Sequence, residues 1–388
     1  MVAGSVAVTS PPTRERAVGL PDIRIPAELL PADGRFNCGP SKIRPAQVAA
    51  LSAVAGDYLG TSHRQRTVRD QVARLRRGIA QLFDAPDGYE VVLGNGGTTA
   101  FWEVATFGLV RERAQLASFG EFGQKLVDAM TAAPFLADPS VRSAPAGSAI
   151  GLTPEDGVDV YGTPQNETST GAAVPVRRVG GGLMLHDATS GAGGLPVDLA
   201  ETDCYYFAPQ KCLGSEGGLW LAILSPAALE RAAQVRATGR YVPAFLDLTV
   251  AIENSRKDQT YNTPSLGTIL LAAEQVDWIL DQGGLDWSVR RCAESAAILY
   301  DWAERTDYTT PFVTDPALRS SVVGTVDLAD GIDAPTVSAV LRANGIRDTE
   351  PYRKLGRNQL RVALFPSIEP ADVAALTRCV DHVVARLG

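Results

Sequence analysis

Residues Cys204-Tyr205-Tyr206-Phe207-Ala208-Pro209-Gln210-Lys211-Cys212-Leu213-Gly214 form an apolar run that stops at a proline and then presents a single lysine. The aromatic residues favour a buried β-strand. A lysine directly after such a strand is costly to keep charged, because burial disfavours the ammonium form. A lone lysine in this position usually extends its amine to water. An amine with a lowered pKa can instead form a Schiff base with a carbonyl group.

A second apolar run, Leu183-Met184-Leu185-His186-Asp187, ends in an acid ahead of this lysine. Pyridoxal phosphate requires such a pair, because a lysine holds its aldehyde and a carboxylate keeps its ring nitrogen protonated. An isolated aspartate after a strand can equally be a turn cap. We predict that Lys211 is the catalytic residue, that Asp187 is its partner, and that pyridoxal phosphate is the cofactor.

The composition is that of an ordinary globular protein, with 388 residues, of which 45% are hydrophobic and 21% charged. The net charge of −8 argues against nucleic acid as a partner, and it means that an anionic substrate must be bound by local arginines. The five cysteines include no CxxC pair, which predicts free thiols in a reducing cytoplasm and no metal site. We find neither a signal peptide nor an apolar run that could span a bilayer, so no membrane partner is expected.

Short apolar strands and helices alternate through the middle of the chain. Strands are expected at residues 90–94, 115–118, 158–162, 183–186, 204–208 and 219–224, with helices at 67–83, 122–132 and 227–237. This alternation predicts an α/β fold with a mostly parallel sheet that is covered on both faces. Ligands bind such folds at the carboxyl ends of the strands. The candidate residues that follow expected strands are Thr98, Thr168, Asp187 and Lys211.

A glycine-rich turn, Asn95-Gly96-Gly97-Thr98-Thr99-Ala100, joins the strand at 90–94 to the helix that follows. Backbone N–H groups and threonine hydroxyls at a helix start can bind an anion. The turn matches neither GxGxxG nor a P-loop, and it is as often purely structural.

The chain divides into three parts by its pattern. Residues 1–22 form a flexible tail rich in small residues and proline, and residues 23–283 form the large cofactor-binding domain. A helix at 266–282 ends at Gly283-Gly284, where we place the boundary. A smaller α+β domain follows at residues 284–388, with strands at 324–328 and 359–364 and helices at 287–304, 334–344 and 370–387.

Eight short motifs occur in order between Phe36 and the C-terminus. They are Phe36-Asn37-Cys38-Gly39-Pro40, Ser62-His63-Arg64, Gly96-Gly97-Thr98-Thr99, Asn166-Glu167-Thr168, Asp187, Gln210-Lys211, Tyr261-Asn262-Thr263-Pro264 and Leu360-Arg361-Val362. With these motifs the chain resembles the phosphoserine aminotransferase family, which belongs to class V of the fold-type I pyridoxal-phosphate enzymes. The resemblance covers most of the chain, and the combination of Asn-Glu-Thr, Gln-Lys and Asn-Thr-Pro is specific.

The resemblance implies a cofactor site. Lys211 would hold the cofactor and move the proton, Asp187 would pair with the ring nitrogen, and Thr168 would bind the ring hydroxyl. Phe122 would stack on the ring, where many relatives carry a tryptophan, so we expect Trp102 only to pack in its helix. The phosphate would be held by Thr98, Thr99 and Gln210 of one subunit and by Asn262 and Thr263 of its partner.

The resemblance also implies a homodimer with shared active sites and arginines that bind the substrate. Arg361 would bind the α-carboxylate in bidentate fashion. His63 and Arg64 would reach in from the partner subunit, and Arg353 would hold the substrate phosphate or the glutamate side chain. The segment at 352–357 departs from the family's usual His-Arg pair, which leaves the choice between Arg353 and Arg357 open.

The implied reaction transfers the amino group of L-glutamate to 3-phosphohydroxypyruvate, which gives O-phospho-L-serine and 2-oxoglutarate for serine biosynthesis. A second substrate, 4-phosphohydroxythreonine of vitamin B6 biosynthesis, stays open. Another class V enzyme is an alternative, either a serine–glyoxylate-type aminotransferase or a cysteine desulfurase. A desulfurase needs a cysteine on a mobile loop, whereas Cys292 and Cys379 fall in helical patterns. A non-enzymatic anion-binding α/β protein, in which Lys211 only contacts phosphate, is the alternative from another class.

Overall fold

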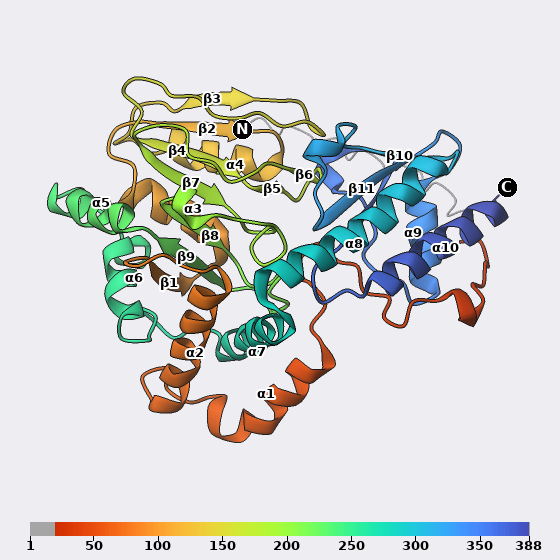
Figure 1. Ribbon diagram of the computed structural model, residues 1–388, viewed down its shortest axis with the longest axis horizontal. Helices are drawn as coiled ribbons and strands as arrows, with labels where there is room; N and C mark the ends of the chain where they lie inside the picture. Colours follow the sequence, from red (N-terminus) through yellow and green to blue (C-terminus); the bar gives the residue numbers. More distant parts are fainter. Residues whose placement is uncertain (1–19, 388) are drawn as a thin grey trace, which may run out of the picture.

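The computed structural model describes residues 20–387, which are built around two β-sheets (Figure 1). The larger sheet has seven strands in the order β1-β9-β8-β7-β4-β2-β3. These strands are β1 (Glu90–Asn95), β2 (Ala114–Ser118), β3 (Ser140–Ser143), β4 (Val160–Pro164), β7 (Leu183–Asp187), β8 (Cys204–Phe207) and β9 (Leu219–Leu224). Most of the predicted tail, residues 1–19, lies outside the described residues.

Strand directions confirm the predicted fold class. Strand β9 is antiparallel to both of its neighbours, β1 and β8, while the pairs β8–β7, β7–β4, β4–β2 and β2–β3 are parallel. Strands β4, β7, β8 and β9 are buried along their whole length. Near-continuous apolar runs predicted β7, β8 and β9 to within about one residue, whereas β4 begins at Val160 and not at residue 158. The edge strand β3 alternates between half-buried and exposed residues, and no apolar run marks it in the sequence.

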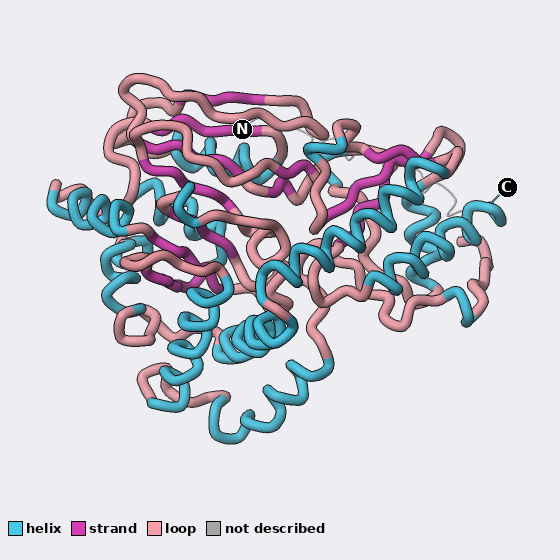
Figure 2. The backbone as a smooth tube through the Cα atoms, viewed as in Figure 1, coloured by secondary structure: helices cyan, strands magenta, loops and turns pink. Residues whose placement is uncertain are grey.

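Helices cover both faces of this sheet (Figure 2). Helices α2 (Arg66–Leu82) and α7 (Leu266–Gln282) pack on one face, where their apolar side chains share a core with β1, β8 and β9. The other face is covered by α3 (Gly97–Gly108), α4 (Glu121–Thr131), α5 (Pro226–Ala237) and α6 (Leu248–Ser255). None of the described helices is long and apolar enough to cross a membrane.

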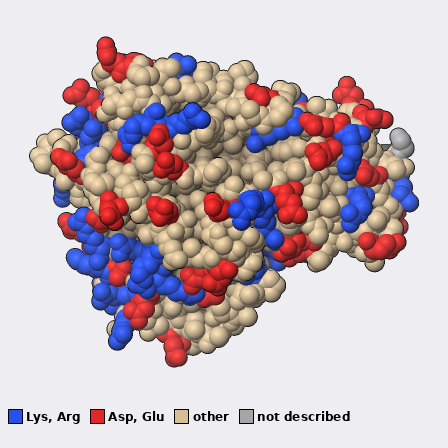
Figure 3. All heavy atoms as spheres, viewed as in Figure 1, with Lys and Arg blue, Asp and Glu red and all other residues tan. Residues whose placement is uncertain are grey.

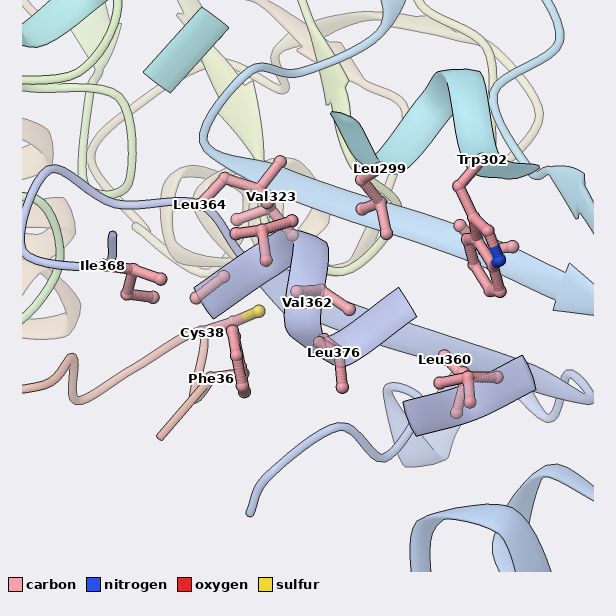
Figure 4. Packing of buried hydrophobic residues seen from close by; sticks show 14 of the residues in the cluster. Phe36, Cys38, Leu299, Trp302, Val323, Leu360, Val362, Leu364, Ile368 and Leu376 are labelled. Atoms are coloured by element: carbon pink, nitrogen blue, oxygen red, sulfur yellow. The ribbon is translucent and has the colours of Figure 1, made fainter. Parts of the chain in front are cut away.

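The smaller sheet is antiparallel and has its own core (Figure 4). Its strands are β10 (Thr309–Pro311), β11 (Val323–Leu328) and β12 (Gln359–Ala363), and its helices are α8 (Gly284–Arg305), α9 (Ala334–Ala343) and α10 (Pro370–Leu387). Ile25, Phe36 and Cys38 also pack in this core. The segment that we assigned to the large domain therefore begins against the smaller sheet, and the limits 23–283 and 284–388 stay a prediction.

The remaining elements are short or peripheral. Helix α1 (Pro45–Tyr58) projects from the body of the chain (Figure 1), and strands β5 (Asn166–Glu167) and β6 (Ala172–Ala173) form a small hairpin. Single 3-10 turns lie at Ala27–Leu29, Leu199–Glu201, Ala244–Leu246, Pro316–Leu318 and Arg353–Leu355.

A close approach between β1 and β9 supports the helix that carries the glycine-rich turn. Gly94 pairs with Trp220, and a Cβ atom at Gly94 would lie 2.3 Å from Cζ2 of the Trp220 ring, which is 2% exposed. The same ring packs against Phe101 of α3, with 4.9 Å between ring centroids. The absence of a side chain at Gly94 thus lets α3 sit close to the sheet.

We expect Gly94→Ala to lower the free energy of unfolding by about 1–3 kcal/mol, because an added methyl group overpacks a rigid core. Urea unfolding monitored by circular dichroism measures the change. Gly56→Ala in α1 is the matched control, since a Cβ there meets no atom within 4 Å, and it should raise stability by up to about 1 kcal/mol. Equal stability of Gly94→Ala and the wild type would contradict the packing described.

Candidate active site

Lys211 lies in the turn after β8 and is half-buried. Its Nζ donates a hydrogen bond of 2.7 Å to the backbone oxygen of Cys38. Gly39 has a φ of +145°, and a Cβ atom there would lie 2.4 Å from Nζ of Lys211. Only glycine fits at this position, because any side chain would displace the amine.

The surroundings of Lys211 shift its titration. Burial lowers the pKa of the amine to about 8, and the positive charge of Arg361 contributes to the same shift. The negative charge of Asp187 acts in the opposite direction. Arg361 and Asp187 therefore both lie close enough to Lys211 to influence its amine electrostatically, and about a tenth of the amine is neutral at pH 7.

Asp187 is the last residue of β7 and is 5% exposed. Its Oδ2 accepts a hydrogen bond of 2.8 Å from the indole Nε1 of Trp102, and its Oδ1 accepts one of 2.9 Å from the backbone nitrogen of Thr189 and another from the Thr189 hydroxyl. Burial raises the pKa of Asp187, and these donors act against that rise. Trp102 thus does more than pack in its helix, which is all that the sequence alone led us to expect. The available signal was a buried indole N–H, which needs an acceptor.

Thr168 follows β5 and joins the two sheets at the site. Its hydroxyl donates to Oγ of Ser190 at 2.7 Å, and its backbone oxygen accepts a hydrogen bond of 3.2 Å from Nη1 of Arg361 on β12. The guanidinium of Arg361 also lies 5.3 Å from the ring centroid of Tyr352. The sequence motifs around Thr168 and Arg361, far apart along the chain, therefore meet.

The glycine-rich turn forms the start of α3. Gly96 and Gly97 have φ angles of 110° and 69°, which explains the glycine pair, and no side chain caps the helix start. Thr98 is buried and Thr99 is exposed in the first turn. The first N–H groups of α3 are thus available for an anion.

Several buried polar atoms in this region have no hydrogen-bond partner within residues 20–387. They include Oε1 of Gln210, Oδ1 of Asn166 and Nε of Arg361. A buried polar atom without a partner is costly. The donor Nε of Arg361, the uncapped start of α3 and the amine of Lys211 fit a polar, anionic ligand that carries a carbonyl group, as pyridoxal phosphate does.

Phe122 lies in the first turn of α4 beside the segment at 352–357. Its ring centroid is 5.9 Å from that of Tyr352, and Lys354 forms an ion pair with Glu121. A cavity of about 220 Å³ lies between α4 and this segment, lined by Gly120, Glu121, Gln124, Ser169, Tyr352, Lys354 and Leu355. Aromatic and ionic contacts therefore connect the smaller sheet's segment to α4.

The four residues expected to act on the partner's site form a separate group. Nδ1 of His63 lies 3.3 Å from Oγ1 of Thr263, and Oδ1 of Asn262 accepts a hydrogen bond of 2.6 Å from Asn95. Burial lowers the pKa of His63, and the charge of Arg64 lowers it further. In the described part of the chain, no hydrogen bond or ion pair links these four residues to Lys211.

The two candidate arginines in the segment at 352–357 differ. Arg357 forms an ion pair with Asp327 and stacks on Phe312, with 4.4 Å from its guanidinium carbon to the ring centroid. Arg353 is exposed, and within residues 20–387 it forms no ion pair.

Basic and acidic side chains are interspersed over the face shown in Figure 3. Binding of an anion therefore depends on individual cationic side chains such as those of Arg353 and Arg361.

Comparisons with known proteins agree with this architecture. The family model for aminotransferase class-V matches residues 155–348. A phosphoserine aminotransferase from Nocardioides sp. is 60% identical over 370 residues, which cover 94% of this chain and 99% of that protein. The crystal structure of a phosphoserine aminotransferase from Cytophaga hutchinsonii has a TM-score of 0.83 at 21% identity and covers 92% of this chain and 100% of that one. A PLP-bound phosphoserine aminotransferase from Trichomonas vaginalis superposes with a TM-score of 0.77 at 16% identity, covering 90% and 99% of the two chains.

The structural neighbours show the fold of the fold-type I aminotransferases, which confirms the predicted fold class. The sequence relatives decide the family: the chain belongs to the phosphoserine aminotransferases of class V. The expected pyridoxal-phosphate-dependent aminotransferase is thereby confirmed, and the relatives favour it over the desulfurase, the serine–glyoxylate-type enzyme and the non-enzymatic binding protein. The roles of individual residues stay predictions.

The lowered pKa of Lys211 predicts how its amine reacts in the cofactor-free protein. Competitive labelling with acetic anhydride should modify Lys211 with a rate that rises with pH around a midpoint of about 8, because only the neutral amine reacts. An unfolded lysine keeps its ordinary pKa of about 10.4. The unfolded state then binds more protons between these two values, so stability should also rise with pH across that window. A labelling midpoint near the ordinary value would contradict the described burial.

Proposed function

We propose that this chain transfers the amino group of L-glutamate to 3-phosphohydroxypyruvate, forming O-phospho-L-serine and 2-oxoglutarate. The observation that supports this most is the meeting of three groups: the amine of Lys211 with its lowered pKa, the buried carboxylate of Asp187 and the guanidinium of Arg361. The first two suit the cofactor and the third suits a carboxylate substrate.

Pyridoxal phosphate, when bound, supplies an electron sink that stabilises negative charge on the substrate's α-carbon. Lys211 would hold the cofactor's aldehyde carbon and afterwards move a proton as general base and acid, which requires a pKa near the working pH. Asp187 would pair with the ring nitrogen, and the hydrogen bonds from Trp102 and Thr189 fix its orientation. Both carboxylate oxygens are thus already held in place.

We assign the remaining cofactor contacts, those to the ring hydroxyl, the ring face and the phosphate, to residues around Lys211 and Asp187. Thr168 would bind the ring hydroxyl through the oxygen that now contacts Ser190, and Phe122 would cover the ring. The start of α3, with Thr98 and Thr99, would bind the phosphate together with the NH₂ group of Gln210. A phosphate there would also interact favourably with the positive end of the α3 dipole.

Arginines would provide substrate recognition. Arg361, anchored through Nη1 to Thr168, has a buried Nε without a partner among the described residues, and it would bind the α-carboxylate. Arg353 would bind the substrate phosphate, or the side-chain carboxylate of glutamate in the other half-reaction. Arg357 is less suited to this role because Asp327 already neutralises it. The two half-reactions use one site, so we expect ping-pong kinetics with parallel double-reciprocal lines.

We further propose that the active enzyme is a homodimer with shared sites. His63 contacts Thr263, and among the described residues no hydrogen bond or ion pair links His63, Arg64, Asn262 or Thr263 to Lys211. All but His63 are exposed. Large apolar side chains are exposed nearby in the chain, including Val48, Val54 and Leu59 around α1 and Tyr261 beside Asn262. Burying such a surface against a second copy would bring these polar groups to the partner's site.

A cytoplasmic location completes the proposal. All five cysteines are free and buried, as expected in a reducing compartment. Their burial raises the pKa of thiols such as Cys292, to about 12, which keeps them unreactive. The substrates would be small molecules, and neither a nucleic acid nor a membrane is part of the proposed function.

The substrate proposal predicts a preference for the phosphorylated acceptor. With glutamate as donor, kcat/KM for 3-phosphohydroxypyruvate should exceed that for hydroxypyruvate at least about a hundredfold, because charged hydrogen bonds to the phosphate are lost in the second case. Arg353→Ala should remove most of this preference, and Arg357→Ala should retain it. The same assay with 4-phosphohydroxythreonine and 2-oxoglutarate tests the second substrate. Equal rates with both acceptors in the wild type would refute the proposed substrate.

The shared-site proposal predicts complementation between two inactive variants. Lys211→Ala and Arg64→Ala should each be inactive alone. After co-refolding in equal amounts, the mixed dimers have one intact site, so about a quarter of wild-type activity should return. Lys211→Ala mixed with Arg361→Ala is the matched control, since both residues belong to the same chain's site and each mixed dimer keeps a lesion in both. No recovery in the first mixture, or equal recovery in both, would argue against a shared site.

A further inference from the structure

Glu167 is a buried acid to which no role has been assigned. It is 0% exposed, it ends β5, and it directly precedes Thr168. Within residues 20–387, no lysine, arginine or histidine forms an ion pair with it, so its charge is compensated by hydrogen-bond donors alone. Burying a carboxylate without an ion pair is costly, and burial raises the pKa of Glu167, so the donors that hold the carboxylate serve a purpose.

The contacts of Glu167 lead to the start of α4. Its Oε2 accepts hydrogen bonds of 3.1 Å and 3.0 Å from the backbone nitrogens of Phe122 and Gly123. Its Oε1 accepts hydrogen bonds of 2.7 Å and 3.2 Å from the hydroxyl and backbone nitrogen of Ser169. The Ser169 hydroxyl oxygen in turn accepts a hydrogen bond of 3.1 Å from the backbone nitrogen of Glu121.

Helix α4 has no cap of its own. Its N-cap residue is Gly120, which has no side chain, and the first three N–H groups of the helix are instead bound by Ser169 and Glu167. Gly120 leaves the necessary room, since a Cβ atom there would lie 2.2 Å from Cγ of Glu167. A negative charge at this position also interacts favourably with the helix dipole.

This arrangement connects two parts of the proposed cofactor site. Phe122, whose N–H binds Glu167, is the proposed ring-stacking residue, and Thr168, the neighbour of Glu167, is the proposed contact of the ring hydroxyl. We infer that Glu167 is a positioning residue, which holds Phe122 and Thr168 in fixed register so that both meet the pyridoxal phosphate ring. The inference rests on the proposed roles of these two residues.

The same helix start also carries the contacts to the segment at 352–357. Glu121 pairs with Lys354, and Phe122 lies against Tyr352. Loss of the Glu167 hydrogen bonds would therefore also weaken the contacts between the start of α4 and the segment at 352–357. A purely structural acid would stabilise the protein without affecting how tightly the cofactor is held.

The test compares Glu167→Gln with the wild type. The amide keeps the size of the side chain, but its NH₂ group cannot accept the hydrogen bonds that one carboxylate oxygen accepts. The dissociation constant of pyridoxal phosphate, measured by equilibrium dialysis, should rise about tenfold or more. Hydrogen exchange in the peptide 119–131 should accelerate, and the visible circular dichroism of the bound cofactor should weaken.

Asp247→Asn is the matched control. Asp247 is also a buried carboxylate, 4% exposed, and its Oδ1 caps α6 by accepting hydrogen bonds from the backbone nitrogens of Thr249 and Val250. Unlike Glu167, it also forms an ion pair, through its Oδ2 with Arg236. No proposed site residue lies on α6. Because α6 packs against α3, this variant should accelerate exchange in α6 and raise the cofactor's dissociation constant by a clearly smaller factor than Glu167→Gln does.

Ser169→Ala provides a milder variant should Glu167→Gln fail to fold. It removes one donor to Glu167 and the acceptor for Glu121, so it should weaken cofactor binding in the same direction by a smaller factor. Wild-type cofactor affinity in whichever of these two variants folds would overturn the inference, as would an equal loss in Asp247→Asn. If the wild-type protein itself did not bind pyridoxal phosphate, the proposed function would fail instead.

Discussion

The hydrogen bond between the amine of Lys211 and the carbonyl oxygen of Cys38 is the contact on which the site depends. Lys211 follows a strand of the larger sheet, whereas Cys38 packs in the core of the smaller one. The contact therefore joins the two cores, and Gly39 permits it because a side chain there would occupy the place of the amine. The position of the reactive group is set by how the two sheets pack.

The charges of the site follow one pattern. The buried carboxylates of Asp187 and Glu167 are stabilised by N–H and O–H donors, and in the described part of the chain neither forms an ion pair. Lys211 and Arg361 likewise have no acidic partner within residues 20–387. The positive charges thus stay available for anionic ligands, in a protein whose net charge of −8 repels them at long range.

Continuous apolar runs made the central strands predictable from sequence. They also predicted that Asp187 and Lys211 lie at the carboxyl ends of these strands. Strand β3 and helix α6 escaped prediction because one is half-exposed and the other spans only Leu248–Ser255. The contacts of Trp102 and Glu167 could not be predicted, since their partners come from distant segments brought together by folding. The choice between Arg353 and Arg357 depends likewise on Asp327, which lies on β11, outside that segment.

The most direct test of the account is to reduce the cofactor-loaded protein with borohydride and to map its peptides by mass spectrometry. The account predicts that the pyridoxyl group is found on Lys211 alone, and that the visible absorbance of the cofactor disappears on reduction. A modified lysine elsewhere in the chain, with residue 211 unchanged, would contradict it.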